Sequence, residues 1–153
     1  MYKLTTEHSF DAAHFLAGYH GKCRNIHGHR WRVMVTVAAE ELEMEGQARG
    51  MLVDFGNLKK DLKKVLSVMD HALIVEEGSL KEKTVEALEE EAFRMVMLPF
   101  RPTAENFSRY FYEEMSKIGY PVESVSVYET PGNCAVYEGW CTNVRREEGH
   151  AQI

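Results

Sequence analysis

The amino-acid sequence predicts an α+β protein in which an antiparallel sheet is covered on one face by two helices. Three patterns favour this class: strict apolar alternation over 29–40, two helical apolar stripes in the middle of the chain, and paired strand patterns at both ends. The predicted order is strand, strand, helix, helix, strand, strand. Hairpins that flank grouped helices are typical of an antiparallel α+β sheet. At 153 residues, 44% of them hydrophobic, we expect one domain over 1–153 with four strands.

Residues 2–10 and 29–40 predict the first two strands. In the second, every other residue is apolar: Trp31, Val33, Val35 and Val37. Successive side chains of a strand point to opposite faces, so His27 and His29 share the face of this stripe if the strand begins early enough to include them.

Two helices follow. Asp54 and Thr103 are the predicted N-caps, and the helices are expected to end near 70–71 and at Gly119. The first helix has a stripe with three-four spacing: Phe55, Leu58, Leu62, Val65, Leu66 and Met69. The second has another: Phe107, Tyr110, Phe111, Met115 and Ile118.

The chain between the helices and the chain after them complete the prediction. Residues 76–92 are rich in Glu and Lys and indicate an exposed insertion that is helical over 79–92, while the apolar run 93–100 favours an extended segment. A hairpin of strands over 122–129 and 134–141, joined by a Pro-Gly-Asn turn, ends the fold. Since the helices cover only one face of the sheet, we expect oligomerisation to bury the other.

Composition excludes several classes of protein. With 18 basic and 24 acidic residues, a net charge of −6 and a pI near 5.7, the chain lacks the basic footprint of a nucleic-acid-binding protein. No apolar run reaches the length of a membrane span, and the N-terminus lacks the apolar core of a signal peptide. The cysteines Cys23, Cys134 and Cys141 form no CxxC pair. This favours a reducing cytoplasm over a disulfide framework, so we expect a cytoplasmic protein with no nucleic-acid or membrane partner.

The stretch His27-Gly28-His29 is the strongest indication of chemistry. Two imidazoles on one strand face, with His14 upstream, are the minimal ligand set of an open zinc site that keeps a position for water or substrate. The alternative is that these histidines near a strand start are turn residues or satisfied polar groups.

Three further residues are candidates for proton transfer. Cys23 is a reactive thiolate, a fourth zinc ligand or an inert half-buried residue. His71, beside Asp70, has an imidazole suited to moving protons near neutrality. The alternative for this pair is a helix C-terminus, where a histidine interacts favourably with the dipole.

Charged side chains indicate where a ligand binds. Glu129 ends a strand face shared with Val125 and Val127, so it either anchors a ligand through two N–H bonds or reaches water. Glu105 lies in the first turn of a predicted helix, where the dipole accounts for it. Four basic residues are predicted near the metal site and either receive phosphates or form a solvated edge: Lys22, Arg24, Arg30 and Arg32.

Six short motifs occur in an order that matches one family. They are Phe10-Asp11-Ala12-Ala13-His14, Cys23-x-x-x-His27-Gly28-His29, Asp54-Phe55, Asp70-His71, Pro102-Thr103-Ala104-Glu105-Asn106 and Glu129-Thr130. On these motifs the chain resembles the 6-pyruvoyltetrahydropterin synthase superfamily, especially its bacterial 6-carboxy-5,6,7,8-tetrahydropterin synthase branch in queuosine biosynthesis. The resemblance covers residues 2 to about 140. The acidic stretch 76–92 departs from it, because the family's usual link at this point is shorter.

The resemblance implies a fold and an assembly. It implies the tunnelling fold, in which three chains combine their four-stranded sheets into a barrel and two such trimers stack into a homohexamer. Family members build the active site across a subunit interface, so its residues need not come from one chain.

The resemblance also implies roles for individual residues. It implies His14, His27 and His29 as ligands of Zn²⁺. It implies Cys23 as the residue that abstracts a proton, Asp70 and His71 as its relay, and Glu129 as the pterin anchor. On the same grounds Glu105 and Thr130 are expected to contact the substrate.

The activity that the resemblance implies is a zinc-dependent carbon–carbon lyase reaction on a pterin side chain. It converts 7,8-dihydroneopterin triphosphate into 6-carboxytetrahydropterin, acetaldehyde and triphosphate. One alternative is the 6-pyruvoyltetrahydropterin synthase reaction, which eliminates triphosphate without cleaving the side chain. The other is a zinc- or pterin-binding module without catalysis.

Overall fold

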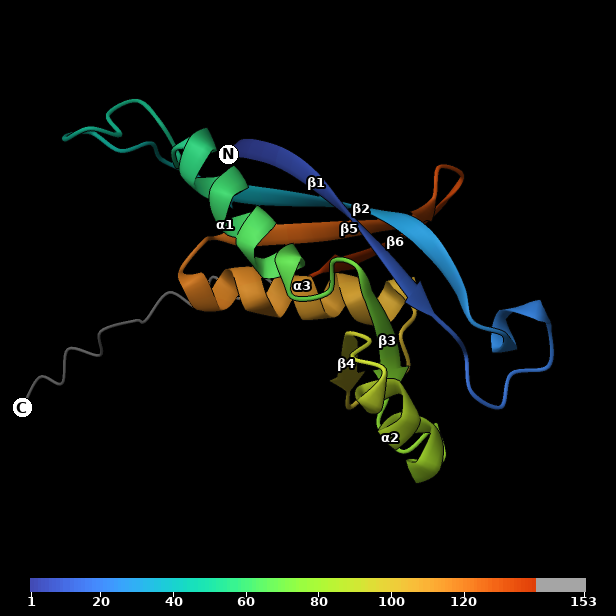
Figure 1. Ribbon diagram of the computed structural model, residues 1–153. Helices are drawn as coiled ribbons and strands as arrows, with labels where there is room; N and C mark the ends of the chain where they lie inside the picture. The colour runs from blue at the N-terminus through green and yellow to red at the C-terminus, as the bar shows by residue number, and fades with distance from the viewer. Residues whose placement is uncertain (140–153) are drawn as a thin grey trace, which may run out of the picture.

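The computed structural model describes residues 1–139 and shows an α+β architecture, as predicted (Figure 1). Four long strands correspond to the predicted ones: β1 (Tyr2–His14), β2 (His27–Ala39), β5 (Val122–Thr130) and β6 (Asn133–Glu138). Two long helices and a smaller unit lie between them: α1 (Phe55–Ser67), β3 (Ala72–Glu76), α2 (Glu82–Glu90), β4 (Met95–Leu98) and α3 (Ala104–Ile118). The predicted last strand extended to Cys141, and its final two residues lie outside the described residues.

The predicted sheet of four antiparallel strands is wrong in this detail. The sheet has six strands in the order β4-β3-β1-β2-β5-β6. The four predicted strands pair antiparallel, but β3 runs parallel to β1, pairing at Ala12–Ala72 and Ala13–Leu73, and β4 runs parallel to β3. Runs of four or five apolar residues do not reveal their pairing in the sequence. The predicted insertion 76–92 contains α2, which connects the two parallel strands as such a connection requires.

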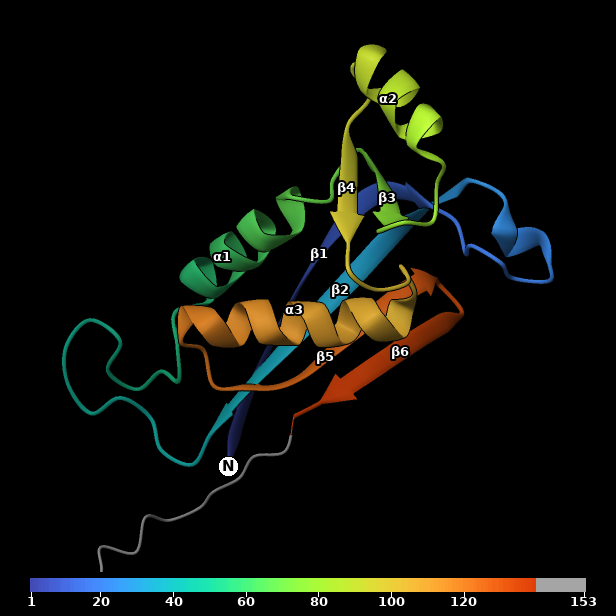
Figure 2. The ribbon, with the colours of Figure 1, turned by 90° about the horizontal axis from the view of Figure 1, so that it is seen from below.

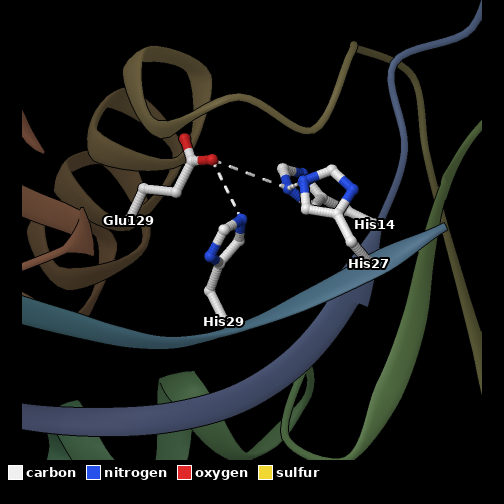
Figure 3. Close-up of side chains that lie close together, drawn as sticks. All are labelled: His14, His27, His29 and Glu129. Carbon is white, nitrogen blue, oxygen red and sulfur yellow. Dashed lines mark hydrogen bonds and ion pairs between the residues drawn. The ribbon is translucent and has the colours of Figure 1, made fainter. Parts of the chain in front are cut away.

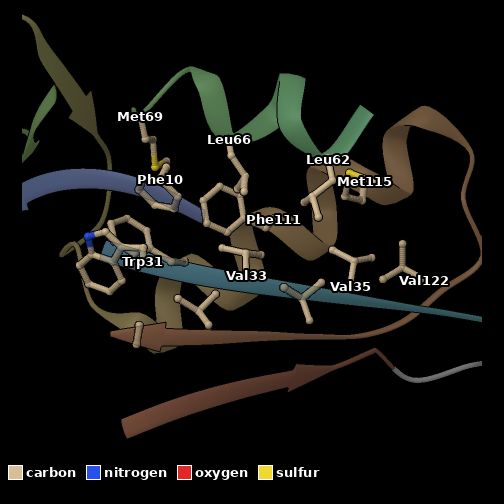
Figure 4. Packing of buried hydrophobic residues seen from close by; sticks show 14 of the residues in the cluster. Phe10, Trp31, Val33, Val35, Leu62, Leu66, Met69, Phe111, Met115 and Val122 are labelled. Atoms are coloured by element: carbon tan, nitrogen blue, oxygen red, sulfur yellow. The ribbon is translucent and has the colours of Figure 1, made fainter. Parts of the chain in front are cut away.

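Helices α1 and α3 pack side by side on one face of the sheet (Figures 1 and 2). Their apolar stripes meet the inward face of β2 and β5 in one continuous core (Figure 4). Fully buried members include Trp31, Val33, Val35, Leu58, Leu62, Phe107, Phe111, Met115, Val125 and Val127. Phe55 and Ile118, both predicted in the stripes, are 59% and 50% exposed, because they lie at the outer ends of the helices.

The helix caps follow the prediction with one difference. The side chain of Asp54 accepts a hydrogen bond from the Asn57 N–H at 2.8 Å, and Thr103 caps α3 in the same way. Helix α1 ends at Ser67, before the predicted 70–71, since the chain turns there and His71 adopts a left-handed conformation with φ 54°.

The face of the sheet away from the helices is polar. Its cross-strand pairs are Thr5 with Thr36, Glu7 with Arg32, Asp11 with Arg30 and Lys3 with Glu123. Burial of an apolar second face is therefore no argument for oligomerisation. The edges of the sheet are a stronger argument for oligomerisation. In the described part of the chain, β6 and the first ten residues of β1 have no strand on their outer side. None of the helices described here is both long and apolar enough to cross a membrane.

Candidate functional site

Three histidines converge where β1 ends and β2 begins (Figure 3). The antiparallel register places His14 opposite His27, and Ala12 opposite His29, so the three rings come together on one face. Their centroids lie 4.5 Å (His14–His27), 5.0 Å (His27–His29) and 5.2 Å (His14–His29) apart. Trp31 lies beneath them, 5.2 Å from His29, which confirms that both β2 histidines share the apolar face of the strand.

Backbone carbonyls fix how two of these rings are protonated. His14 Nδ1 lies 2.6 Å from the Pro102 carbonyl oxygen, and His27 Nδ1 lies 2.7 Å from the Asn25 carbonyl oxygen. A carbonyl only accepts, so each Nδ1 donates and each neutral ring presents a lone pair at Nε2. The two Nε2 atoms are 3.1 Å apart. Two lone pairs facing each other at this distance call for a cation between them, and a ligand histidine that donates its other N–H to a carbonyl is the usual arrangement at metal sites.

Glu129 and His29 complete the group. His29 Nε2 is buried and has no hydrogen-bond partner among the described residues, although Glu129 Oε1 lies 2.9 Å away in an ion-pair contact that is not aligned as a hydrogen bond. Ligand atoms of His14, His27, His29 and Glu129 all lie within 4.8 Å of one another. An orphaned imidazole nitrogen beside two convergent lone pairs fits a bound metal ion, and three imidazoles with a carboxylate suit a transition metal such as zinc.

Burial favours the neutral form of the histidines, which is the form that binds a metal. Burial lowers the pKa of His14, and the neighbouring His27 lowers it further. Burial also lowers the pKa of His29, against the opposing effect of the Glu129 carboxylate. Both rings are thereby held neutral at neutral pH, and a neutral imidazole is the form that binds a metal.

The start of α3 holds His14 in place from a distant part of the sequence. Pro102, whose carbonyl accepts from His14, directly precedes the N-cap Thr103. The Asn106 side chain donates to the Arg101 carbonyl at 2.9 Å and so ties down the same turn. The sequence analysis assigned this motif to helix initiation and missed its second role. The only signal for that role was the resemblance of Pro-Thr-Ala-Glu-Asn to a motif of the family.

Asp70 and His71 form the predicted pair. His71 Nδ1 lies 3.0 Å from Asp70 Oδ2, while Asp70 Oδ1 accepts from the Asp11 N–H at 2.9 Å. The Asp11 amide lowers the pKa of Asp70, and the hydrogen bond from His71 adds to this effect. The Asp70 carboxylate therefore stays ionised and orients the imidazole.

This pair lies apart from the histidine cluster. His71 is 77% exposed and borders a cavity of about 680 Å³, together with the charged side chains of Asp11, Arg30 and Arg94. On β1, Asp11 alternates with Ala12 and His14, so its side chain points to the opposite face of the sheet. Although the cavity also reaches His29 at the start of β2, the described cluster of potential metal ligands does not include His71.

The remaining predicted site residues are also dispersed. Cys23 is half-buried in a short 3₁₀ helix (Lys22–Arg24) of the β1–β2 loop and lies outside the cluster of potential ligands in the described chain. Glu105 is exposed in the first turn of α3, and Thr130 ends β5 next to Glu129. The four basic residues predicted near the metal site, Lys22, Arg24, Arg30 and Arg32, do not form one group. Arg30 and Arg32 pair with acidic residues on the polar face of the sheet.

Comparison with known proteins identifies the family. Residues 3–140 match the family model described as 6-pyruvoyl tetrahydropterin synthase. The chain belongs to this family. A similar curated relative is the 6-carboxy-5,6,7,8-tetrahydropterin synthase of Haemophilus influenzae, 34% identical over 141 residues that cover 90% of this chain and 99% of the relative. The protein of the same name from Synechocystis is 31% identical over 139 residues, covering 90% and 93%.

Solved structures of family members share the fold. The 6-pyruvoyl tetrahydropterin synthase of Caenorhabditis elegans is 28% identical, with a TM-score of 0.62 over 91% of this chain and 97% of that one. The 6-pyruvoyl tetrahydropterin synthase of Plasmodium vivax gives a TM-score of 0.64 at 20% identity, over 89% and 96%, and this likeness concerns the fold alone. The predicted resemblance to the family is thus confirmed.

Proposed function

We propose that this family member is a 6-carboxy-5,6,7,8-tetrahydropterin synthase of queuosine biosynthesis, which converts 7,8-dihydroneopterin triphosphate into 6-carboxytetrahydropterin, acetaldehyde and triphosphate. The observation that carries the proposal is the set of three histidines whose free nitrogens converge on one point. Relatives that bear this name, 34% and 35% identical over 90% and 89% of the chain, support the choice of reaction. The cysteine composition favours a cytoplasmic location.

We further propose that His14, His27 and His29 hold Zn²⁺. The carbonyls of Pro102 and Asn25 orient two of the rings, so the site is pre-organised before the metal binds. Bound zinc supplies a Lewis acid that polarises the hydroxyl groups of the substrate side chain.

Glu129 is proposed to anchor the pterin. Its carboxylate ends an otherwise apolar strand face, with Val125 and Val127 fully buried before it. Two carboxylate oxygens can accept two parallel N–H bonds from the pterin ring and its amino group. Thr130, next in sequence, and Glu105 on α3 are proposed as further substrate contacts.

Two groups are proposed to move protons. The Cys23 thiolate takes a proton from the substrate side chain, and the His71 imidazole, oriented by Asp70, exchanges protons with the substrate as it reacts. Since neither residue belongs to the histidine cluster of its own chain, we propose that one active site combines residues of more than one copy of this chain.

The free sheet edges support such an assembly. Pairing of β6 of one copy with β1 of the next would satisfy both edges and close a ring. We expect a homohexamer, built as a dimer of trimers, and light scattering at micromolar concentration should give its mass. A monomeric mass would contradict both the assembly and the shared site.

A mixing experiment tests the shared site directly. Cys23→Ala and His71→Ala are each expected to keep only a small, measurable residual turnover, whereas their co-assembly should recover activity because some sites receive both intact side chains. A mixture no more active than either variant alone would mean that both residues serve from the same chain.

The reaction itself is tested by product analysis. With 7,8-dihydroneopterin triphosphate supplied to the zinc-loaded protein, mass spectrometry should detect 6-carboxytetrahydropterin, and a carbonyl trap should capture acetaldehyde. A product that keeps its three-carbon side chain would assign the protein to the 6-pyruvoyltetrahydropterin synthase reaction, which the family description equally accommodates. Binding without consumption of substrate would favour the non-catalytic module.

A further inference from the structure

Arg94 connects the 76–92 segment to the end of α1. It lies between α2 and β4, and its Nη2 donates to the carbonyl oxygens of Ser67 at 3.0 Å and Val68 at 2.8 Å. The last carbonyls of a helix have no partner within the helix, and they carry the negative end of its dipole. A guanidinium is therefore well suited to cap this helix end.

The backbone of Arg94 is fixed on the other side of the same turn. Its carbonyl oxygen accepts from the Leu73 N–H at 2.9 Å. The side chain thus contacts the chain just before Asp70 and His71, and the carbonyl contacts it just after them. Arg94 brackets the pair from both directions along the chain.

The bracketed turn has a conformation that needs support. His71 has φ 54°, a left-handed conformation that costs a non-glycine residue energy and persists only where the surroundings hold it. Strand β1 supplies part of this support, since Asp11 O accepts from the His71 N–H at 2.7 Å and the Asp11 N–H donates to Asp70. At the start of the turn, Arg94 adds to the support that comes from Met69, which is fully buried in the core and whose N–H donates to the Leu66 carbonyl oxygen at 3.0 Å.

The same residue borders the space that His71 faces. The cavity of about 680 Å³ is bounded by His71, by Arg94, and by Leu88 and Phe93 of the segment that precedes it. The other charged side chains there are Asp11 and Arg30, which pair with each other. The Nη2 group of Arg94 is engaged with two backbone carbonyls, so this side chain contributes to holding the turn.

We propose that Arg94 is a positioning residue, which holds the α1–β3 turn so that Asp70 presents His71 to the substrate. This inference rests on the proposed function, in which His71 exchanges protons with the substrate. Arg94 acts through His71 and does not touch the reacting atoms.

The test compares kcat and KM for Arg94→Met, Arg94→Lys, His71→Ala and the double variant Arg94→Met/His71→Ala, each loaded with zinc. Arg94→Met keeps the aliphatic stem but loses the donors, and it should lower kcat by up to ~100-fold with KM unchanged, since a misplacement of about 1 Å has such an effect. Arg94→Lys should be intermediate. In the His71→Ala background, Arg94→Met should have no further effect, because groups that act as a unit are not additive. Arg109→Met, at an exposed and ion-paired arginine on α3, is the matched control.

The outcomes separate the two proposals. An equal loss of kcat in both backgrounds, or full activity in Arg94→Met, would overturn the role of Arg94. Full activity in His71→Ala would instead overturn the proposed function of His71. If Arg94→Met does not fold, as judged by thermal melting, Arg94→Lys replaces it in the same comparison. Its smaller loss of kcat should then be absent in the His71→Ala background.

Discussion

His27→Ala is expected to remove the bound metal and to reduce turnover to background. Wild-type protein should bind about one zinc per chain, as an open site with three protein ligands does. His27 Nε2 lies 3.1 Å from His14 Nε2, so the substitution removes one of the facing lone pairs and leaves two imidazoles, too few for tight binding. Loss of a residue that merely orients a ligand costs up to ~100-fold in metal affinity, and loss of a ligand should cost more. Metal analysis after dialysis and a turnover assay measure both effects.

Two variants make the result specific. His20→Ala, at an exposed histidine of the β1–β2 loop, should keep both metal and turnover. Cys23→Ala should keep the metal and lose turnover, since the thiol lies outside the histidine cluster. Loss of zinc in Cys23→Ala would make Cys23 a ligand, and retention of zinc in His27→Ala would contradict the three-histidine site.

The histidine site could be predicted because strand periodicity determines it. Once the alternation from Trp31 to Val37 is extended backwards, His27 and His29 must lie on the core face, and antiparallel pairing with the preceding strand brings His14 opposite His27. The Pro102 carbonyl could not be predicted in this way. It meets His14 across 88 residues of sequence, and a backbone acceptor leaves no trace in residue type.

The β3-α2-β4 unit shows a second limit of sequence reasoning. Its strands have five and four residues, and β3 pairs with β1 at only two positions. Tertiary packing determines whether such short segments form strands, and the periodicity of four or five residues is too weak to distinguish a strand from a buried loop. The helix within 76–92 was predicted from the sequence. That Leu73, Leu88 and Phe93 line the cavity beside His71 could not be predicted, because it depends on the parallel pairing of β3 and β4.

Glu129 has two candidate roles, pterin anchor and metal ligand, and an experiment must separate them. Its place on the apolar face of β5 follows from the alternation with Val125 and Val127, and favours a ligand anchor. The structure also brings its carboxylate to 2.9 Å from His29 Nε2 and 3.9 Å from His14 Nε2, within reach of a bound metal. A fourth protein ligand would close the zinc site and leave no position for substrate, which conflicts with a catalytic metal. We therefore propose that the carboxylate binds the pterin and does not bind the metal.

Glu129→Gln should consequently weaken pterin binding without loss of zinc. The substitution keeps the shape of the side chain but replaces one acceptor oxygen with an N–H₂ group, which faces a ring donor and leaves it unpaired. Spoiling one partner of a buried, charge-assisted pair costs roughly 2–5 kcal/mol, which is about 30-fold to several thousand-fold in Kd. Calorimetric titration with 7,8-dihydroneopterin measures the affinity, metal analysis measures the zinc, and Glu138→Gln at an exposed position of β6 is the control. Zinc loss in Glu129→Gln would make Glu129 a metal ligand, and unchanged affinity with zinc retained would reduce it to a strand-end carboxylate that reaches water.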